Sequence, residues 1–420
     1  MAESAQSPES SAVTDLDLLQ PAPPRRYHAP TVVEPHVQWS DAWRALRADT
    51  PQRLRAALCA AYGAKHCLLL DRARTGLALL VEGMKLRGEW ITTSFMHRPT
   101  AVLLACKTAG LRLADIDDHF TMDPASAEAA AAPGTVGLLA THMFGKVAAI
   151  DRLRELADRR GLFLVENCVH LPPFLEVAGK RAGGFGDATL LSFNVDKPLG
   201  GLLGGALLTN RDDVWERVTH LPLAAPDLQE LRDRVQTALL AYRLKPLLLQ
   251  VPWLGDRFRR ASNLREEIVS FDVERYRHYI PRRIHPLQAA IALGSLQEEP
   301  ERTRRRVANA LSFSATFGES DAVTLPVDNP QMPHSFVYFP VILRRHSRFE
   351  LAQRLAAAGI ETKWRYYPLH LQPDLRAVTS TALDNTDRLW RQHLLLPINA
   401  RMSEVDIAAL ADRFRSTLLS

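Results

Sequence analysis

The stretch Thr189-Leu-Leu-Ser-Phe-Asn-Val-Asp-Lys197-Pro-Leu-Gly200-Gly-Leu-Leu-Gly-Gly205-Ala-Leu-Leu-Thr209 places one lysine between two apolar runs. Residues 188–193 and 204–209 are short apolar segments next to glycine and polar residues, a pattern typical of strands. Lys197 is therefore expected in the connection between two strands. A partly buried lysine amine can act as a nucleophile toward an aldehyde cofactor, whereas an isolated lysine in a loop is more often simply solvated.

A second segment points to the same kind of site. The apolar run Leu162-Phe-Leu-Val165 leads into Glu166-Asn167-Cys168-Val169-His170, which predicts a strand with polar groups at its carboxyl end. Open α/β sheets bind ligands at that edge. The two segments together predict a site for pyridoxal phosphate, a cofactor that a lysine holds through its aldehyde.

The order of apolar runs and helical patterns predicts the fold class. Strands are expected at 66–70, 90–94, 111–116, 136–141 and 162–166, and helices between them at 75–87, 99–109 and 150–160. Such alternation is typical of an α/β protein with a doubly wound, mainly parallel sheet. After residue 283 strands and helices mix over shorter lengths, with helices expected at 289–296 and 303–313. This mixture predicts a smaller α+β carboxyl-terminal domain.

Several short motifs, in order over about 350 residues, resemble the DegT/DnrJ/EryC1/StrS family of sugar aminotransferases. They are Tyr62-Gly63-Ala64-Lys65-His66, Thr141-His142-Met-Phe144-Gly145, the Lys197 segment, Gly359-Ile-Glu-Thr362, Tyr367-Pro-Leu-His370 and Leu394-Leu-Leu-Pro397. The resemblance implies a fold-type-I, aspartate-aminotransferase-like enzyme with pyridoxal 5'-phosphate. It also implies ping-pong transfer of an amino group from glutamate to a nucleotide-linked keto sugar, with Lys197 as the covalent link and general acid/base.

One position departs from the family pattern. The family places Glu-Asp at the strand end, and its aspartate pairs with the pyridine nitrogen; this chain has Glu166-Asn167. Glu166 cannot easily substitute, because adjacent strand residues point to opposite faces. A neutral amide gives no ion pair, so two alternatives stay open beside ordinary transamination: altered chemistry on the same cofactor, or a catalytically silent regulatory paralogue.

The resemblance implies further cofactor-binding residues. His170 matches a position near the ring hydroxyl, and Ser192 matches a hydroxyl that contacts the cofactor phosphate. Arg74 and Thr75 lie between a strand and a helix, where helix N–H groups bind phosphate. Thr75 is alternatively a helix N-cap.

Two more residues are implied by the family's subunit arrangement and ring stacking. His97 aligns with the aromatic residue that stacks on the ring, with a surface histidine as the alternative. Arg283 matches an arginine that approaches the neighbouring subunit's site, while Pro281 replaces the family's asparagine two residues earlier. The chain is therefore expected to form a homodimer.

The expected domain organisation is a disordered tail at 1–30, a large cofactor-binding domain at 31–225, a helical insertion at 226–280 and a small domain at 281–420. The tail is rich in Ser, Pro and Ala and lacks the apolar segment of a signal peptide. Within the insertion, 238–260 combines an apolar run with arginines. It is either helix packed on the protein or across a dimer interface, or a segment that lies on a membrane surface with its arginines toward lipid phosphates.

Composition excludes several classes of protein. The formal charge of +5 comes from arginines mixed with acids, so no nucleic-acid partner is expected. Four cysteines without paired spacing are typical of reduced core residues in a cytoplasmic protein. No metal-ligand spacing is present, and no metal is expected.

Overall fold

The computed structural model describes residues 43–44, 47–238, 273–329, 331–372, 375 and 379–419. The predicted tail at 1–30 lies outside these residues, and so does nearly all of the predicted membrane-contacting stretch, 239–260. None of the helices in the described part of the chain has the length and apolar character needed to cross a bilayer.

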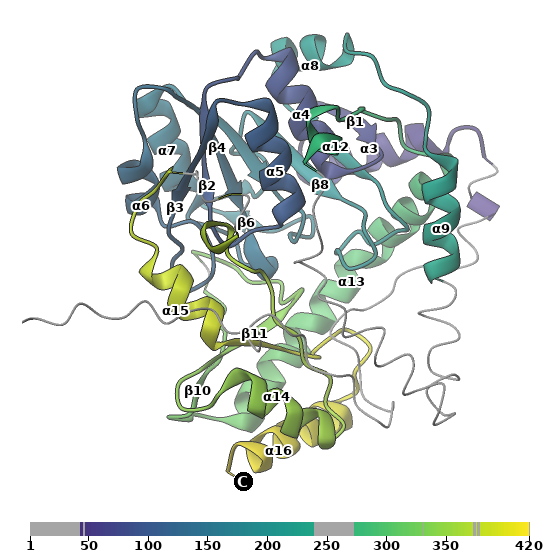
Figure 1. Ribbon diagram of the computed structural model, residues 1–420. Helices are drawn as coiled ribbons and strands as arrows, with labels where there is room; N and C mark the ends of the chain where they lie inside the picture. Colours follow the sequence, from purple (N-terminus) through teal and green to yellow (C-terminus); the bar gives the residue numbers. More distant parts are fainter. Residues whose placement is uncertain are drawn as a thin grey trace, which may run out of the picture.

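An eight-stranded sheet forms the centre of the large domain (Figure 1). Its order is β1-β9-β8-β5-β4-β2-β3-β12, and all neighbours are parallel except β9, which is antiparallel to both β1 and β8. The prediction of a mainly parallel sheet is confirmed. The strands are β1 (His66–Leu70), β2 (Glu89–Thr93), β3 (Gly110–Ala114), β4 (Thr135–Thr141), β5 (Phe163–Asn167), β8 (Ala188–Ser192), β9 (Gly205–Thr209) and β12 (Thr379–Ser380).

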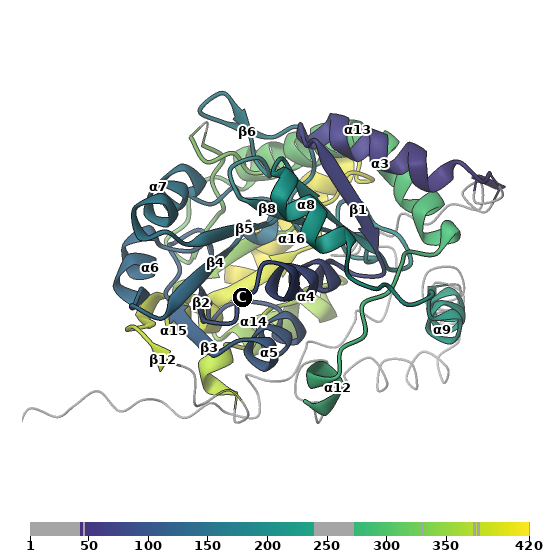
Figure 2. The same ribbon diagram turned by 90° about the horizontal axis from the view of Figure 1, so that it is seen from above.

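Helices cover both faces of this sheet, as Figure 2 shows from above. Alternate strand residues separate into two cores: Leu138 and Leu164 pack on one face, and Leu139 and Val165 on the other. This is the two-sided burial that parallel sheets require. On the first face lie α3 (Thr50–Tyr62), α6 (Pro124–Ala130) and α7 (Ile150–Arg160), and on the second α4 (Ala73–Gly83), α5 (Arg98–Lys107), α8 (Asp212–Thr219) and α12 (Glu274–Arg277).

The small domain contains a three-stranded antiparallel sheet of β10 (Val323–Thr324), β11 (Phe339–Leu343) and β13 (His393–Leu396). Its helices are α14 (Arg348–Ala357), α15 (Asp384–Gln392) and α16 (Glu404–Leu419). In the large domain, β6 (Glu176–Val177) and β7 (Lys180–Arg181) pair as a short antiparallel ribbon. The mixture of strands and helices expected for the carboxyl-terminal domain is observed.

One long helix, α13 (Pro286–Phe317), runs from the large domain into the small one (Figure 1). The sequence predicts two helices here, at 289–296 and 303–313, on either side of Pro300, which cannot donate a backbone hydrogen bond. The structure has one continuous helix instead. It begins with a capping box of His285 and Gln288, and its two halves are buried in different cores: 289–296 in the large domain and 310–317 in the small domain. Burial of both halves explains why the helix continues past the proline.

The described parts of the predicted insertion pack on the large domain. Leu231 of α9 (Leu228–Ala238) is buried against Leu202 and Ile291, and Glu230 pairs with Arg72. Tyr276 of α12 is buried as well. The boundaries predicted for the four domains stay a prediction. Residues 289–296, which the sequence assigns to the small domain, pack in the core of the large sheet.

Candidate active site

Lys197 lies in the loop from β8 to β9, between the sheet and the small domain. The loop closes on itself, because Phe193 N donates to Gly204 O at 2.9 Å and Gly201 N donates to Phe193 O at 2.8 Å. Only 9% of Lys197 is exposed. Its Nζ lies 2.6 Å from His170 Nε2 and 3.6 Å from Asp196 Oδ2. The structure thus brings Lys197 and His170 together.

The hydrogen bonds of His170 define the proton arrangement around the lysine. His170 Nδ1 accepts from Phe144 N at 3.3 Å, and burial together with Lys197 holds the pKa of His170 well below its usual value. The imidazole is therefore neutral, with its proton on Nε2. That proton is donated to the lysine amine or to the Tyr366 hydroxyl at 3.2 Å. Lys197 Nζ thus lies between the His170 ring and the Asp196 carboxylate.

Asp196, Arg365 and Tyr338 surround the lysine, and the sequence did not single out any of the three. Arg365 Nη1 donates to Asp196 Oδ2 at 2.8 Å, and the Tyr338 hydroxyl donates to Asp196 at 3.0 Å to O and 3.2 Å to Oδ2. Burial raises the pKa of Asp196, but Lys197 and Arg365 outweigh it and keep the pKa well below its usual range. From the sequence, only Asp196 could have been predicted as a site residue, because it directly precedes Lys197.

At the end of β5, Glu166 and Asn167 point to opposite faces. The Glu166 carboxylate is fully buried and accepts from the backbone N–H groups of Gly183 at 2.8 Å, Phe185 at 2.5 Å and Gly186 at 2.5 Å. The acid is thus a structural anchor. Asn167 Nδ2 donates to Thr141 Oγ1 at 3.0 Å on the neighbouring strand. The alternation expected from the sequence is observed, and the amide is the group left for a ligand.

The first turn of α4 lies directly beside the start of β9. A Cβ at Gly205 would overlap the backbone N of Ala73, so glycine permits this approach. Ser192 pairs with Gly205 across the strands, which brings its hydroxyl to the amino end of α4. The helix has no side-chain cap, and Arg74 Nε is buried without a hydrogen-bond partner. Uncapped N–H groups beside a cation and a hydroxyl form a favourable setting for an anion.

Thr75 lies in the first turn of α4 and is buried. The N-cap position of α4 is Arg72, so the N-cap alternative is wrong. The Thr75 hydroxyl donates to Asp71 Oδ1 at 2.6 Å and bonds the Tyr279 hydroxyl at 2.7 Å. A contact of Thr75 with the cofactor phosphate stays a prediction.

His97 lies at the edge of this cluster. It stands at the start of α5, where Nδ1 bonds Thr100 Oγ1 at 3.2 Å and the ring meets that of Tyr366 edge-on at 6.3 Å. Although part of the side chain is exposed, desolvation of the ring and the charges of Arg74 and Lys197 lower its pKa to about 3. Arg283 is exposed, and within the described residues only its backbone forms hydrogen bonds, with Ala224. Among those residues no hydrogen bond or ion pair joins the Arg283 side chain to Lys197.

A buried lysine beyond the carboxyl edge of a doubly wound sheet, next to a small α+β domain, defines the fold class of type-I pyridoxal phosphate-dependent transferases. Solved structures agree on the fold. The TDP-sugar-product complex of DesI aligns with a TM-score of 0.73 and 22% identity over 94% of both chains. Helicobacter pylori PseC, an aminotransferase of pseudoaminic acid biosynthesis, aligns with a TM-score of 0.71 and 18% identity over 93% of this chain and 99% of its own.

The chain belongs to the DegT/DnrJ/EryC1/StrS aminotransferase family, whose profile matches residues 37–245 and 263–415. A dTDP-3-amino-3,4,6-trideoxy-alpha-D-glucose transaminase of Streptomyces venezuelae is 27% identical over 89% of each chain. Other curated relatives match over a shorter length. The L-glutamine:2-deoxy-scyllo-inosose aminotransferase of Streptoalloteichus tenebrarius is 33% identical, but the match spans 41% of this chain and 42% of the relative.

The pairing of Asp196 predicts how stability depends on pH. Its pKa is lower in the folded than in the unfolded chain, so the ionised group stabilises the fold above the usual carboxyl pKa of about 3.9. That contribution is lost as the pH falls below this value. Asp196→Asn leaves Arg365 buried without its partner and is expected to cost about 3–5 kcal/mol at pH 7. Urea unfolding should show a smaller difference from wild type at pH 3; an equal difference at both pH values would contradict the assignment.

Proposed function

We propose that this protein is a pyridoxal phosphate-dependent aminotransferase that moves an amino group from glutamate to a nucleotide-linked keto sugar. The observation that carries the proposal is the buried Lys197 amine, whose Nζ lies 2.6 Å from Nε2 of the neutral His170 and 3.6 Å from Oδ2 of the ionised Asp196. Family membership supports it. So does the name of the Streptomyces venezuelae relative, an amino-sugar transaminase.

The residues present fit the cofactor. Arg74, with its unpartnered Nε, and Ser192 stand at the uncapped start of α4, an arrangement suited to a phosphate group. Asn167 would face the ring nitrogen, and His97 would cover one face of the ring. Lys197 would hold the aldehyde carbon. When bound, pyridoxal phosphate supplies a ring that accepts the electron pair released at the substrate carbon.

Lys197 Nζ is the group that moves the proton. As a neutral amine it takes a proton from the substrate carbon, and as an ammonium group it returns that proton to the acceptor. His170 orients the amine, because its Nε2 lies within hydrogen-bond distance of Nζ, at 2.6 Å. Asp196, at 3.6 Å, places a negative charge beside the same nitrogen. The two neighbours thus fix where Nζ lies when it moves the proton.

Asn167 favours a second candidate function, altered chemistry on the same cofactor. Its amide is neutral and is already bonded to Thr141, so it provides no ion pair for the ring nitrogen. Reactions that need less stabilisation of a carbanion tolerate this loss better than transamination does. The retained set of Lys197, His170 and Ser192 favours a working enzyme over a silent paralogue.

The assembly proposed is a homodimer in the cytoplasm. Arg283 is exposed, and among the described residues of its own chain no hydrogen bond or ion pair joins it to Lys197, which suits a role at the neighbouring subunit's site. The four free cysteines, two of them buried, suit a reducing compartment. Contact of 238–260 with a membrane surface is retained as a proposal for the predicted insertion.

Lys197→Ala is expected to abolish the visible absorbance of the bound cofactor and all transamination while the fold persists. The reason is that this side chain alone supplies the covalent link. Absorbance spectra, and mass spectrometry of peptides after borohydride reduction, measure the change. Lys180→Ala is a matched control, since Lys180 is an exposed lysine of the same domain. A variant that still reduces at the same peptide would overturn the assignment.

Asn167→Asp is expected to speed the half-reaction with glutamate. A carboxylate at this position stabilises a protonated ring nitrogen by about 1–3 kcal/mol, which corresponds to roughly tenfold or more in rate. Stopped-flow absorbance after addition of glutamate measures it, with Asn167→Ala as the control for loss of the amide. If Asn167→Asp loses cofactor or slows every half-reaction, the altered chemistry becomes the better reading.

Subunit mixing tests the proposed role of Arg283. If Arg283 serves the neighbouring site, a mixed dimer of Lys197→Ala and Arg283→Ala chains contains one intact site and one doubly defective site. Such dimers, tagged and purified after coexpression, should show roughly half of wild-type activity. Each variant alone should be inactive or strongly impaired. An active monomer in light scattering, or no recovery in the mixed dimer, would contradict the proposal.

A further inference from the structure

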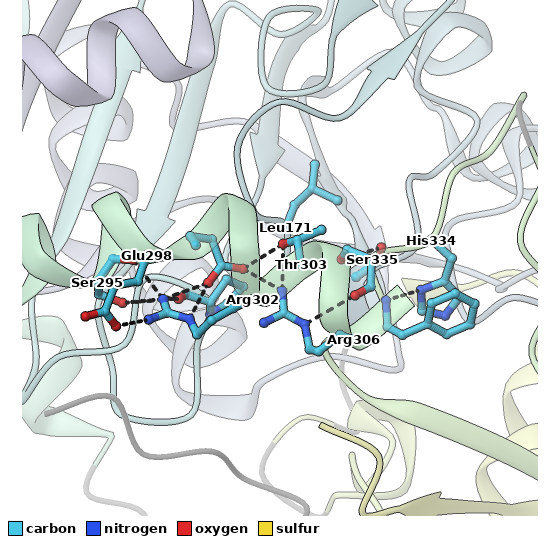
Figure 3. Close-up of polar contacts among 12 residues, drawn as sticks. Leu171, Ser295, Glu298, Arg302, Thr303, Arg306, His334 and Ser335 are labelled. Atoms are coloured by element: carbon cyan, nitrogen blue, oxygen red, sulfur yellow. Dashed lines mark hydrogen bonds and ion pairs between the residues drawn. The ribbon is translucent and has the colours of Figure 1, made fainter. Parts of the chain in front are cut away.

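A carboxylate buried on α13 lies between two arginines, far from any solvent. Glu299 is fully buried, and its Oε2 accepts from Arg302 Nε at 2.9 Å and Nη2 at 2.7 Å. Its Oε1 accepts from Arg306 Nη2 at 2.5 Å and from the Thr303 hydroxyl at 2.9 Å. Figure 3 shows Arg302 and Arg306 on successive turns of this helix. Three buried charges are costly unless every member is paired, so each guanidinium is held in one place.

The first arginine holds the loop of the lysine. Arg302 Nη2 donates to the carbonyl of Pro198 at 3.0 Å, and the Ser295 hydroxyl donates to the same carbonyl at 3.3 Å. Pro198 directly follows Lys197. The backbone on the carboxyl side of the lysine is therefore fixed by a guanidinium that Glu299 orients.

The second arginine reaches His170 through the junction of the domains. Arg306 Nε donates to the carbonyl of Ser335 at 3.3 Å, and Ser335 in turn donates to the carbonyl of Gly145 from its N at 2.8 Å and from its hydroxyl at 3.0 Å. Gly145 has a φ of +92°, and a Cβ there would collide with the Ser335 hydroxyl. The preceding residue, Phe144, donates its backbone N–H to His170 Nδ1.

We propose that Glu299 is a positioning residue for the two nitrogens of the site, Lys197 Nζ and His170 Nε2. One carboxylate oxygen starts the chain of bonds through Arg302 to the lysine loop, and the other starts the chain through Arg306 to His170. The first chain ends at the carbonyl of Pro198, directly after Lys197, and the second ends at His170, whose Nε2 lies 2.6 Å from Lys197 Nζ. Glu299 itself touches neither of them. Its catalytic consequence rests on the proposed function, whereas its effect on the loop does not.

The experiment compares Glu299→Gln with Glu301→Gln, which removes one negative charge from an exposed position of the same helix. Hydrogen exchange of the cofactor-free protein is followed by mass spectrometry for the peptide spanning 193–203. For Glu299→Gln we expect exchange of this peptide to rise about tenfold, since its anchor is lost, while β1 exchanges as in wild type. In the loaded protein we expect kcat to fall on the order of a hundredfold, with KM for glutamate changed less than about threefold. Glu301→Gln should match wild type in both measurements.

A Glu299→Gln protein that is less heat-stable, yet exchanges at the wild-type rate over 193–203 and keeps its kcat, would overturn the inference. If wild type itself binds no cofactor, the proposed function fails and the exchange measurement alone decides the positioning role. If Glu299→Gln does not fold, Arg302→Lys is measured in the same way. A lysine keeps the charge but replaces the planar guanidinium with one nitrogen, so the two-nitrogen bond to Glu299 that aims Nη2 at the Pro198 carbonyl is lost. Unchanged exchange of the loop would again overturn the inference.

Discussion

The interaction on which the structure most depends is the burial of one helix in two hydrophobic cores. Residues 289–296 of α13 pack with the large sheet, and Ala310, Phe313 and Phe317 pack with β11 and α16 of the small domain. A helix of 32 residues cannot bend freely without breaking backbone hydrogen bonds. The orientation of the two domains is therefore set by the continuous helix α13 that they share, and not only by contacts between their surfaces. Lys197 and Arg365, which come from different domains, meet because of it.

At the junction of the domains, polar groups from both sides meet at Asp196. Arg365 from the small domain pairs with Asp196, and Tyr338 next to β11 donates to the same residue. Each of these groups would be costly to bury alone. Together with His170 they surround the amine of Lys197. Aromatic rings from both domains, among them Phe144, Tyr338 and Tyr366, exclude water from this space.

The sequence predicts those parts of the site that depend on local pattern. Apolar runs of strand length bounded by glycine predict β5, β8 and β9, and the period of two residues predicts that Glu166 and Asn167 diverge. Lys197 and His170 follow from their places after these strands. What brings the two together is a contact across 27 residues of chain, which the family resemblance supplied and local pattern could not.

Other features depend on tertiary contacts that no local rule contains. Arg365 meets Asp196 across 169 positions of sequence, so neither residue alone reveals the pair. Thr75 lies at a position in the sequence where a helix N-cap is expected, but in the structure its hydroxyl is hydrogen-bonded to Asp71 and Tyr279. The local pattern predicts separate helices at 289–296 and 303–313, yet burial on both sides keeps α13 whole through Pro300, and Arg302 Nη2 donates to the Ser295 carbonyl in that turn at 2.8 Å.

At the end of β5, Glu166 serves the fold, whereas its neighbour Asn167 is proposed to serve the reaction. Glu166 ties the strand to the loop at 183–186 through three backbone N–H groups, whereas the Asn167 side chain makes, within the described residues, one hydrogen bond, to Thr141. A lineage can therefore exchange the residue at 167 while the loop and the strand stay where they are. Selection acting on the reaction can vary this one position nearly independently of selection acting on the scaffold. A family with this layout can diversify its chemistry through single substitutions without first acquiring compensating changes elsewhere.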